Sequence, residues 1–266
     1  SGTDWLVVDH YALDARWQRA ARPPGARLMV LDDLADRAHD CDLLLDQTLG
    51  RVAADYAGLI PSGAGLLLGA SMALLRPRFA QLRQQSLERR ARGVGRMLVS
   101  LGGADASNLT TRVIDAIDRC SWSEPVAVDV VLGGVNPWIS EVKARAEQSP
   151  IAMRVLVDAS DMAELMALAD LAIGTAGTTS WERCCLGLPS ILVIAAENQR
   201  RTAEALSGAG AATVLEASDH LVDDLVAEIA RFSRDPSLLT DMSENAAMIV
   251  DGSGCDRVVD ALEAMR

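Results

Sequence analysis

The residues best suited to bind a ligand lie within residues 171–199. An apolar run at 171–173 predicts a buried parallel strand. Residues 174–180, which we call the cradle, follow it with two glycines and four hydroxyl side chains. A helix that begins here would point its first backbone N–H groups and the positive end of its dipole at one spot. The cradle therefore predicts an anion-binding turn.

Glu182 lies on the helix that is predicted to follow the cradle. A carboxylate repels a phosphate, but it accepts hydrogen bonds from hydroxyl groups and so suits a ribose diol. Together, the cradle and Glu182 predict a nucleotide site. The alternative is that Glu182 is a solvated acid in a first helical turn, a position that the helix dipole also favours.

A second glycine pair, Gly102 and Gly103, follows a predicted strand at 96–101. Such a pair either lets the backbone approach a phosphate or simply makes a tight strand-to-helix turn, and the residues leave both interpretations open. The glycines at 133 and 134 follow the next predicted strand. We interpret that pair as a turn.

The three histidines differ in position. His10, with Tyr11 beside it, ends the first predicted strand, at the edge where open α/β sheets place their ligands. A structural role for His10 and a capping role for Tyr11 are the alternatives to chemistry. His39 and His220 lie in polar stretches and are predicted at the surface.

Composition and pattern indicate the fold class. Half of the 266 residues are hydrophobic but only 3% are aromatic, so the core must consist of Ala, Leu, Val and Ile. Predicted strands and helices alternate at the spacing of βαβ units, which indicates α/β layers around parallel sheets. We predict two Rossmann-like domains, 1–92 and 93–266. Their boundary is expected at 91–95, where a basic helix meets two glycines.

Charge and cysteine usage narrow the partners. The net charge of −12 argues against a nucleic-acid partner, because no basic stripe is available to neutralise phosphates. Five cysteines without a CxxC pair indicate neither a disulfide framework nor a zinc site, which favours a reducing cytoplasm. No apolar run reaches the ~20 residues of a membrane-spanning helix. Nothing in the sequence calls for a metal or a cofactor.

The C-terminal half resembles the nucleotide-sugar domain of GT-B glycosyltransferases, especially the lipid II N-acetylglucosaminyltransferase type. The shared features run in the same order in this chain, at 162–170, 174–180, Glu182, 187–189 and 198–199. A closer similarity is to the UDP-sugar hydrolase family of pseudaminic acid biosynthesis. It is carried by motifs spread along the chain, at 8–11, 40–44, 73–76, Phe79, 102–105, 108–109 and 197–199.

The resemblance implies a GT-B-like fold and a reaction. That family hydrolyses UDP-2,4-diacetamido-2,4,6-trideoxy-β-L-altropyranose to UDP and the free sugar, with water attacking the anomeric carbon. Glu182 would then bind the ribose, and backbone near Val157 the uracil. Tyr11 and Asn198 would lie at the sugar. The diphosphate and the remaining substrate contacts would fall to residues of the matched motifs: Gly102, Gly103, Asn108, Gly177, Thr178, Thr179, Ser180, Glu197 and Gln199.

One feature of that family has no counterpart here. Its members open with a Gly-rich strand, turn and helix of the form G-x-G-H-x-x-R, which carries the main candidate for the catalytic base. We therefore expect an incomplete N-terminal domain, with His10 as the histidine nearest to that role, and a chain that binds UDP but turns over poorly. Two alternatives to hydrolysis remain, a GT-B glycosyltransferase and a non-catalytic fragment that binds nucleotide-sugars. The resemblance also predicts that a final helix at 256–266 packs back toward the N-terminal half.

Overall fold

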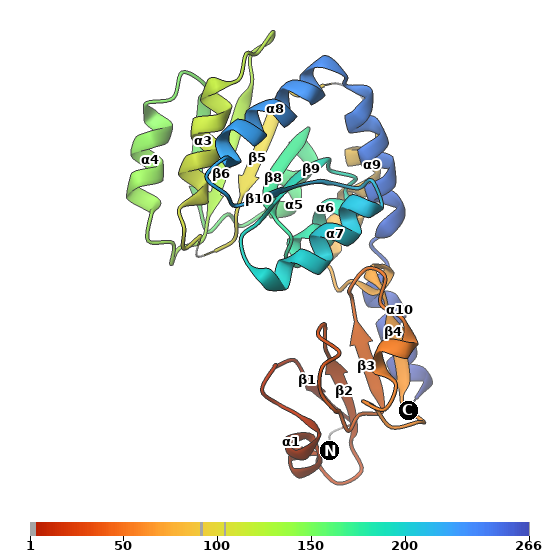
Figure 1. Ribbon diagram of the computed structural model, residues 1–266. Coiled ribbons are helices and arrows are strands. Elements are labelled where there is room, and N and C mark those ends of the chain that lie inside the picture. The colour runs from red at the N-terminus through yellow and green to blue at the C-terminus, as the bar shows by residue number, and fades with distance from the viewer. Residues whose placement is uncertain (1–3, 91–92, 104, 266) are drawn as a thin grey trace. The chain divides into compact units, whose positions relative to one another are not determined.

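The structure is a computed structural model that describes residues 4–90, 93–103 and 105–265. It divides into two compact units (Figure 1). The first comprises Ser1–Leu75 and Val250–Arg266, and the second comprises Arg76–Ile249. Each unit has its own parallel sheet, which confirms the α/β class.

The first unit is built on four parallel strands in the order β1-β2-β3-β4. They are Trp5–Val8, Arg27–Leu31, Leu43–Asp46 and Gly65–Leu68. Because side chains alternate along a strand, neighbouring leucines face opposite sides of the sheet. Leu44 packs in a cluster with Tyr56, whereas Leu43 packs on the other face with Val258. The short elements are α1 (Ala15–Ala21), η1 (Ala53–Tyr56) and η2 (Ala70–Met72).

The last helix, α10 (Gly254–Ala264), belongs to the first unit although it ends the chain. Its Val258 is buried against the β2–β3 face, and Met265 packs there as well. Gly254 lies so close to the backbone at Ala73 that a Cβ would collide with it. The prediction that the final helix packs with the N-terminal half is confirmed.

The second unit holds a six-stranded parallel sheet in the order β10-β9-β8-β5-β6-β7. The strands are β5 (Arg96–Ser100), β6 (Ala127–Leu132), β7 (Ala152–Val157), β8 (Leu171–Thr175), β9 (Ser190–Ile194) and β10 (Thr213–Glu216). The chain starts in the middle at β5, builds outward to β7, and then returns to β8 on the other side of β5. The order therefore reverses between β5 and β8, the point at which doubly wound sheets bind ligands.

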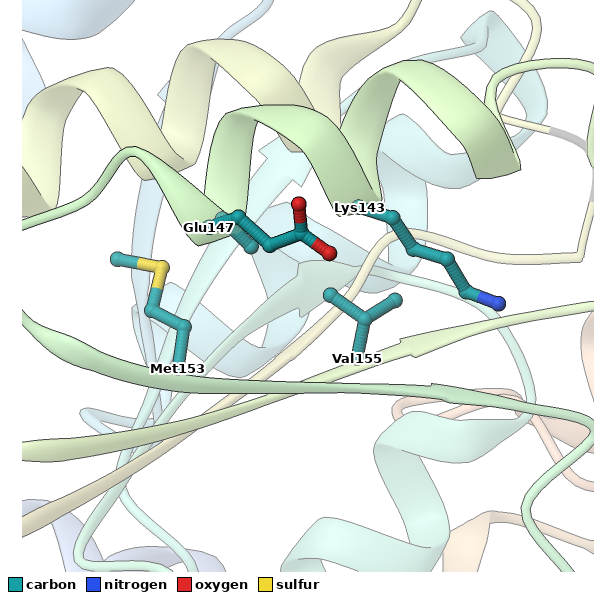
Figure 2. A pocket seen from close by; sticks show the side chains of 5 residues that line it. Lys143, Glu147, Met153 and Val155 are labelled. Atoms are coloured by element: carbon teal, nitrogen blue, oxygen red, sulfur yellow. The ribbon is translucent and has the colours of Figure 1, made fainter.

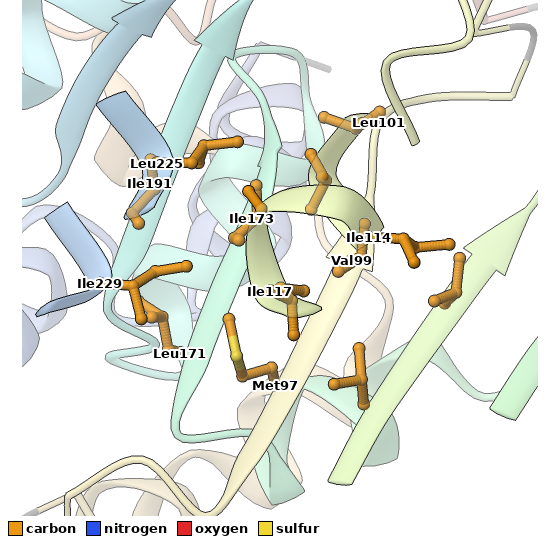
Figure 3. Packing of buried hydrophobic residues seen from close by; sticks show 14 of the residues in the cluster. Met97, Val99, Leu101, Ile114, Ile117, Leu171, Ile173, Ile191, Leu225 and Ile229 are labelled. Carbon is orange, nitrogen blue, oxygen red and sulfur yellow. The ribbon is translucent and has the colours of Figure 1, made fainter. Parts of the chain in front are cut away.

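Helices cover both faces of this sheet. Figure 3 shows one face, where Ile114 and Ile117 of α3 and Leu225 and Ile229 of α8 close over apolar residues of the central strands. On the other face α2 packs against α5 and α6, and α6 packs against α9. The helices are α2 (Pro77–Leu87), α3 (Leu109–Arg119), α4 (Ile139–Glu147), α5 (Met162–Leu168), α6 (Thr179–Cys185), α7 (Arg200–Gly208), α8 (Leu221–Arg234) and α9 (Ser237–Ile249). In the described part of the chain, no helix is both long and apolar enough to cross a bilayer.

Helix α2 and the turn after it explain why the units divide at residue 76 and not at 91–95. The predicted boundary placed this basic helix with the N-terminal domain, but its cations point into the second unit. Arg83 donates to the carbonyls of Cys185 and Ala247, at the ends of α6 and α9. Arg90 donates to the carbonyls of Ala169 and Leu186, at the ends of α5 and α6. Arginines thus satisfy the negative C-terminal ends of three helices.

Arg90 is the most buried of these cations, and burial lowers the pKa of its guanidinium to about 9. We expect Arg90→Leu to lower the free energy of unfolding by about 2–4 kcal/mol, because several buried carbonyls lose a charged donor. Removing a buried charge offsets part of that loss. Chemical denaturation of the full chain measures the change. Gln84→Leu, at an exposed position of α2, is the control and should change stability by less than about 0.5 kcal/mol. An equal loss in both variants would contradict this role for Arg90.

Candidate functional site

The two glycine turns predicted from the sequence meet where the strand order reverses. Strands β5 and β8 are parallel neighbours, with Ser100 paired to Gly174, so their carboxyl ends lie side by side. Gly102 follows β5 in the left-handed region, at φ +91°, and a Cβ there would lie 3.9 Å from Thr175 Oγ1. The Gly102–Gly103 turn and the cradle therefore share one edge of the sheet.

A buried arginine is hydrogen-bonded to both ends of the cradle. The Arg183 guanidinium donates from Nη2 to the Thr175 carbonyl at 2.6 Å and to Ser180 Oγ at 3.0 Å. Burial lowers its pKa to about 10. Gly174 makes room for it, because a Cβ at that position would lie 2.6 Å from Arg183 Nη1 and 2.9 Å from the Ser100 carbonyl. Arg183 was not predicted as a site residue. The one sequence signal for it is a cation on a helix that is otherwise predicted to pack in the interior.

The cradle residues differ in their access to a ligand. Ser180 is buried with its hydroxyl on Arg183, so that oxygen has a structural partner. Thr178 is exposed, whereas Gly177 and Thr179 are half-buried. No side chain of the described residues caps the start of α6. The first turn of α6 thus keeps backbone donors and the Thr178 hydroxyl at the surface.

Glu182 lies in the first turn of α6, with 18% of its side chain exposed. Burial raises the pKa of its carboxyl, and the charges of Arg76 and Arg183 act in the opposite direction. Its Oε1 lies 3.7 Å from Arg76 Nη2. A half-buried carboxylate with one distant cation is suited to accept hydrogen bonds from a polar ligand.

The helix that follows the Gly102–Gly103 turn begins differently. Asp105 accepts hydrogen bonds from the backbone N–H groups of Leu109 at 2.8 Å and Thr110 at 2.9 Å, at the start of α3. Asn108 is also engaged, since it donates to Glu141 Oε1 at 2.7 Å. A carboxylate of the chain itself therefore occupies these donors. Gly102 and Gly103 offer only their backbone to a phosphate.

Two further loops lie at the same edge. Val157 ends β7 and is 36% exposed. The next residue, Asp158, accepts a hydrogen bond from the Gly134 N–H at 2.6 Å, which holds the β6 and β7 loops together. Gly133 packs on the Gly103 backbone, where a Cβ would lie 2.8 Å from its carbonyl oxygen. The interpretation of these two glycines as a turn agrees with this packing.

The polar cluster after β9 forms the short helix η3 (Glu197–Gln199). Glu197 pairs with Arg200 at 3.1 Å, and Gln199 Oε1 accepts from the Ala195 N–H at 3.1 Å. Asn198 is exposed. Since β9 neighbours β8, these residues follow the same sheet edge as the cradle.

The remaining predicted residues, His10 and Tyr11, lie in the first unit. Both are exposed. His10 Nδ1 accepts a hydrogen bond from the Ala12 N–H at 3.1 Å, so the neutral ring carries its proton on Nε2. The Tyr11 hydroxyl donates to Asp33 Oδ2 at 3.1 Å, and burial followed by the Asp33 charge raises its pKa.

Asp33 belongs to an acidic group that the sequence analysis did not single out. Burial raises its pKa, a trend that the Tyr11 hydrogen bond opposes and the charges of Asp32 and Asp46 reinforce. Asp32 and Asp46 are both buried and share the Tyr56 hydroxyl, at 2.9 and 2.7 Å. Asp32 follows β2 and Asp46 ends β3, so this group marks the carboxyl edge of the first sheet.

The prediction of a surface position for His39 is wrong. Its side chain is fully buried, with Nδ1 3.0 Å from Gln18 Nε2 and Nε2 3.8 Å from Asp32 Oδ1. Gln18 and Asp32, which are both buried, supply polar groups beside the ring in the interior, although Asp36 and Ala38 next to it in the sequence are exposed.

One surface pocket lies away from this edge (Figure 2). It has a volume of about 260 Å³ and is lined by Lys143, Ala146 and Glu147 of α4 and by Met153 and Val155 of β7. The predicted site residues are not part of its lining. Among the residues with described positions, no cluster of three His, Cys, Asp or Glu side chains is arranged to hold a metal ion.

Comparisons with known proteins bear on this edge. Residues 101–253 match the model of the glycosyltransferase family 28 C-terminal domain, a span that includes the Gly102–Gly103 turn, the cradle and Glu182. The chain is 29% identical over 197 residues to the spore coat polysaccharide biosynthesis protein SpsG of Bacillus subtilis. That match covers 73% of this chain and 57% of the length of SpsG.

A second relative and a solved structure extend the comparison. The chain is 24% identical over 206 residues to the UDP-2,4-diacetamido-2,4,6-trideoxy-beta-L-altropyranose hydrolase of Campylobacter jejuni, a match that covers 77% of this chain and 71% of that protein. The crystal structure of Acinetobacter baumannii MurG superposes with a TM-score of 0.70 at 18% identity, covering 96% of this chain and 71% of MurG. At that identity the likeness concerns the fold, which is GT-B-like with parallel sheets.

The packing at Gly174 can be tested by adding a methyl group. We expect Gly174→Ala to lower the free energy of unfolding by about 1–3 kcal/mol, because the new Cβ overpacks Arg183 and the Ser100 carbonyl. Gly177→Ala is the matched control, since a Cβ there meets no described atom within 4 Å. Denaturant unfolding of both variants gives the comparison. If Gly174→Ala is as stable as Gly177→Ala, the proposed fit of Arg183 under the cradle is wrong.

Proposed function

The chain belongs to the family of the glycosyltransferase family 28 C-terminal domain, and on that basis we propose that it binds a UDP-sugar and hydrolyses it to UDP and the free sugar. The sugar that we propose is the 2,4-diacetamido-trideoxy hexose named in the Campylobacter relative. The observation that carries the proposal is the meeting of the cradle, the Gly102–Gly103 turn and Glu182 in one unit, where the strand order reverses.

Each part of a UDP moiety has a proposed partner in the second unit. Glu182 would accept hydrogen bonds from the ribose hydroxyls, and backbone at Val157 would contact the uracil. The diphosphate would lie on the first turn of α6, at Gly177, Thr178 and Thr179. Backbone N–H groups there would stabilise the charge that develops on the departing UDP.

The reaction also needs a proton acceptor for the attacking water. Within the first unit, the Asp33 carboxylate is a stronger base than usual, because burial raises its pKa, and it accepts a hydrogen bond from Tyr11. His10 Nδ1 already accepts the Ala12 N–H. We propose Tyr11 and Asn198 as sugar contacts, as the resemblance implies.

Transfer of the sugar to an acceptor is the second candidate, because the matched family is named for glycosyltransferases. The two reactions share the UDP site and differ only in what attacks the anomeric carbon. The third candidate is a non-catalytic chain that binds UDP but converts no UDP-sugar.

Binding through Glu182 is directly testable. Glu182→Gln keeps the shape of the side chain but replaces a charged acceptor, for which a hydrogen bond contributes ~1.5–3 kcal/mol. We expect UDP affinity, measured by calorimetry at pH 7.5, to fall by more than tenfold with an unchanged melting temperature. Because burial raises the pKa of Glu182, wild-type affinity should hold above that pKa and decline as the pH falls through it. Equal UDP affinity in both proteins would place the ribose elsewhere.

Steady-state release of UDP tests the reaction. We expect UDP and free sugar in equal amounts from the diacetamido-trideoxy substrate in buffer alone, without an acceptor.

The other outcomes are equally specific. UDP release that requires an added acceptor would favour transfer. No release from any UDP-sugar, with UDP binding intact, would leave the non-catalytic alternative.

A further inference from the structure

Arg76 is the ion-pair partner that the described residues give to Glu182. It precedes the first residue of α2, and its guanidinium stacks over the Phe79 ring, 5.5 Å from the centroid. Phe79 is fully buried, so the ring is a fixed support. Stacking on a fixed ring restricts the directions in which this arginine can reach, and one of them is toward Glu182.

The spacing of the pair is informative. Arg76 Nη2 lies 3.7 Å from Glu182 Oε1, which is too long for a hydrogen bond but close enough for an electrostatic attraction. A bidentate salt bridge would use the lone pairs of both carboxylate oxygens. At 3.7 Å the guanidinium attracts the carboxylate and leaves those lone pairs to other donors.

Of the two cations whose charges act on Glu182, Arg76 is the exposed one. Arg183 is wholly buried under the cradle and bonded to Thr175 and Ser180, whereas 56% of the Arg76 side chain is exposed. Arg83 of α2 is directed at carbonyl groups. Helix α9, which also packs on α6, carries its acids Asp241 and Glu244 at exposed positions.

We propose that Arg76 is a positioning residue for the nucleotide: it holds Glu182 as an oriented, negatively charged acceptor whose two oxygens are free for the 2′ and 3′ hydroxyls of a ribonucleoside diphosphate. The inference rests on the proposed function, because it presumes that Glu182 binds the ribose. It adds a source of selectivity for ribose over 2′-deoxyribose, since a charged carboxylate that accepts from both hydroxyls loses one hydrogen bond when the 2′ hydroxyl is absent.

The direction of the pH effect follows from the charges. Burial raises the pKa of Glu182, and Arg76 is the first of the two cations that lower it. Affinity that needs the carboxylate is present above this pKa and lost as the pH falls through it. Without Arg76 the pKa rises further, so the loss of affinity begins at a higher pH.

The test uses the full chain and calorimetric titration with UDP from pH 5 to 8. For Arg76→Met we expect the acid decline in affinity to move upward by about one pH unit, the low end of the effect of a nearby opposite charge, because the pair is partly exposed. Each variant is divided by wild type at the same pH, so the titration of UDP itself cancels. The preference for UDP over 2′-deoxy-UDP should fall at least threefold. Arg76→Lys should restore part of both effects.

Arg78→Met is the matched control. Arg78 is the second residue of α2, is similarly exposed, and pairs with Asp161 at 3.5 Å, not with Glu182. It should keep the wild-type pH profile and the wild-type preference for the ribonucleotide. Melting temperatures of all variants check that α2 remains folded.

The outcomes separate this inference from the proposed function. If Glu182→Gln loses UDP affinity while Arg76→Met keeps the wild-type profile and preference, the role of Arg76 is overturned and the nucleotide site stands. Equal changes in Arg76→Met and Arg78→Met would overturn it too, because a general loss of charge would explain both. If Glu182→Gln binds UDP normally, the ribose assignment fails and the inference fails with it.

Discussion

The geometry of the second unit's sheet edge depends on one buried cation. The Arg183 guanidinium lies under the cradle, where it bonds the carbonyl that ends β8 and the hydroxyl of Ser180 in the first turn of α6. A fully buried charge is costly, and these two acceptors bond its Nη2 while its Nε has no hydrogen-bond partner among the described residues. Loss of either acceptor would therefore be costly, which holds both in place. The strand end and the helix start are thereby fixed relative to each other. The absence of a side chain at Gly174 makes the space.

Helix α6 has only seven residues, and its two ends have different roles. At the C-terminal end, Ser86 and Arg90 bond the Leu186 carbonyl, and Arg83 bonds the Cys185 carbonyl. Those donors all come from α2 or the turn that follows it. At the N-terminal end, no described side chain serves as a cap. The side-chain contacts that stabilise α6 thus lie at its C-terminal end, which leaves its first turn for the ligand that we propose.

The sequence was sufficient for the elements but not for the strand order that brings the two turns to one edge. Strand and helix periodicity predicted β5, β8 and the turns after them, because buried parallel strands are continuous apolar runs and glycines interrupt them. It did not identify Arg183, Arg90 or the buried His39, since a charged or polar residue normally indicates a solvent-exposed position. Their burial depends on carbonyls and side chains from distant segments. The unit boundary at residue 76 was missed for the same reason: α2 and the turn after it are polar in composition, yet their arginines bond helix ends about 80–160 residues further along the chain.

Helices α3 and α6 both begin at the sheet edge where the strand order reverses. Their first turns differ in how well they could bind an anion. The first N–H groups of α3 already bond the Asp105 carboxylate, which is held close by a backbone in the left-handed region at φ +37°. A second anion there would meet that negative charge. At α6 the first turn carries Glu182, which lies beside Arg76. We therefore propose that a diphosphate is disfavoured at α3 and binds at α6, where a diol bonded to Glu182 would place it. In this proposal the carboxylates of the chain, more than its cations, decide how a nucleotide is oriented on an acidic protein.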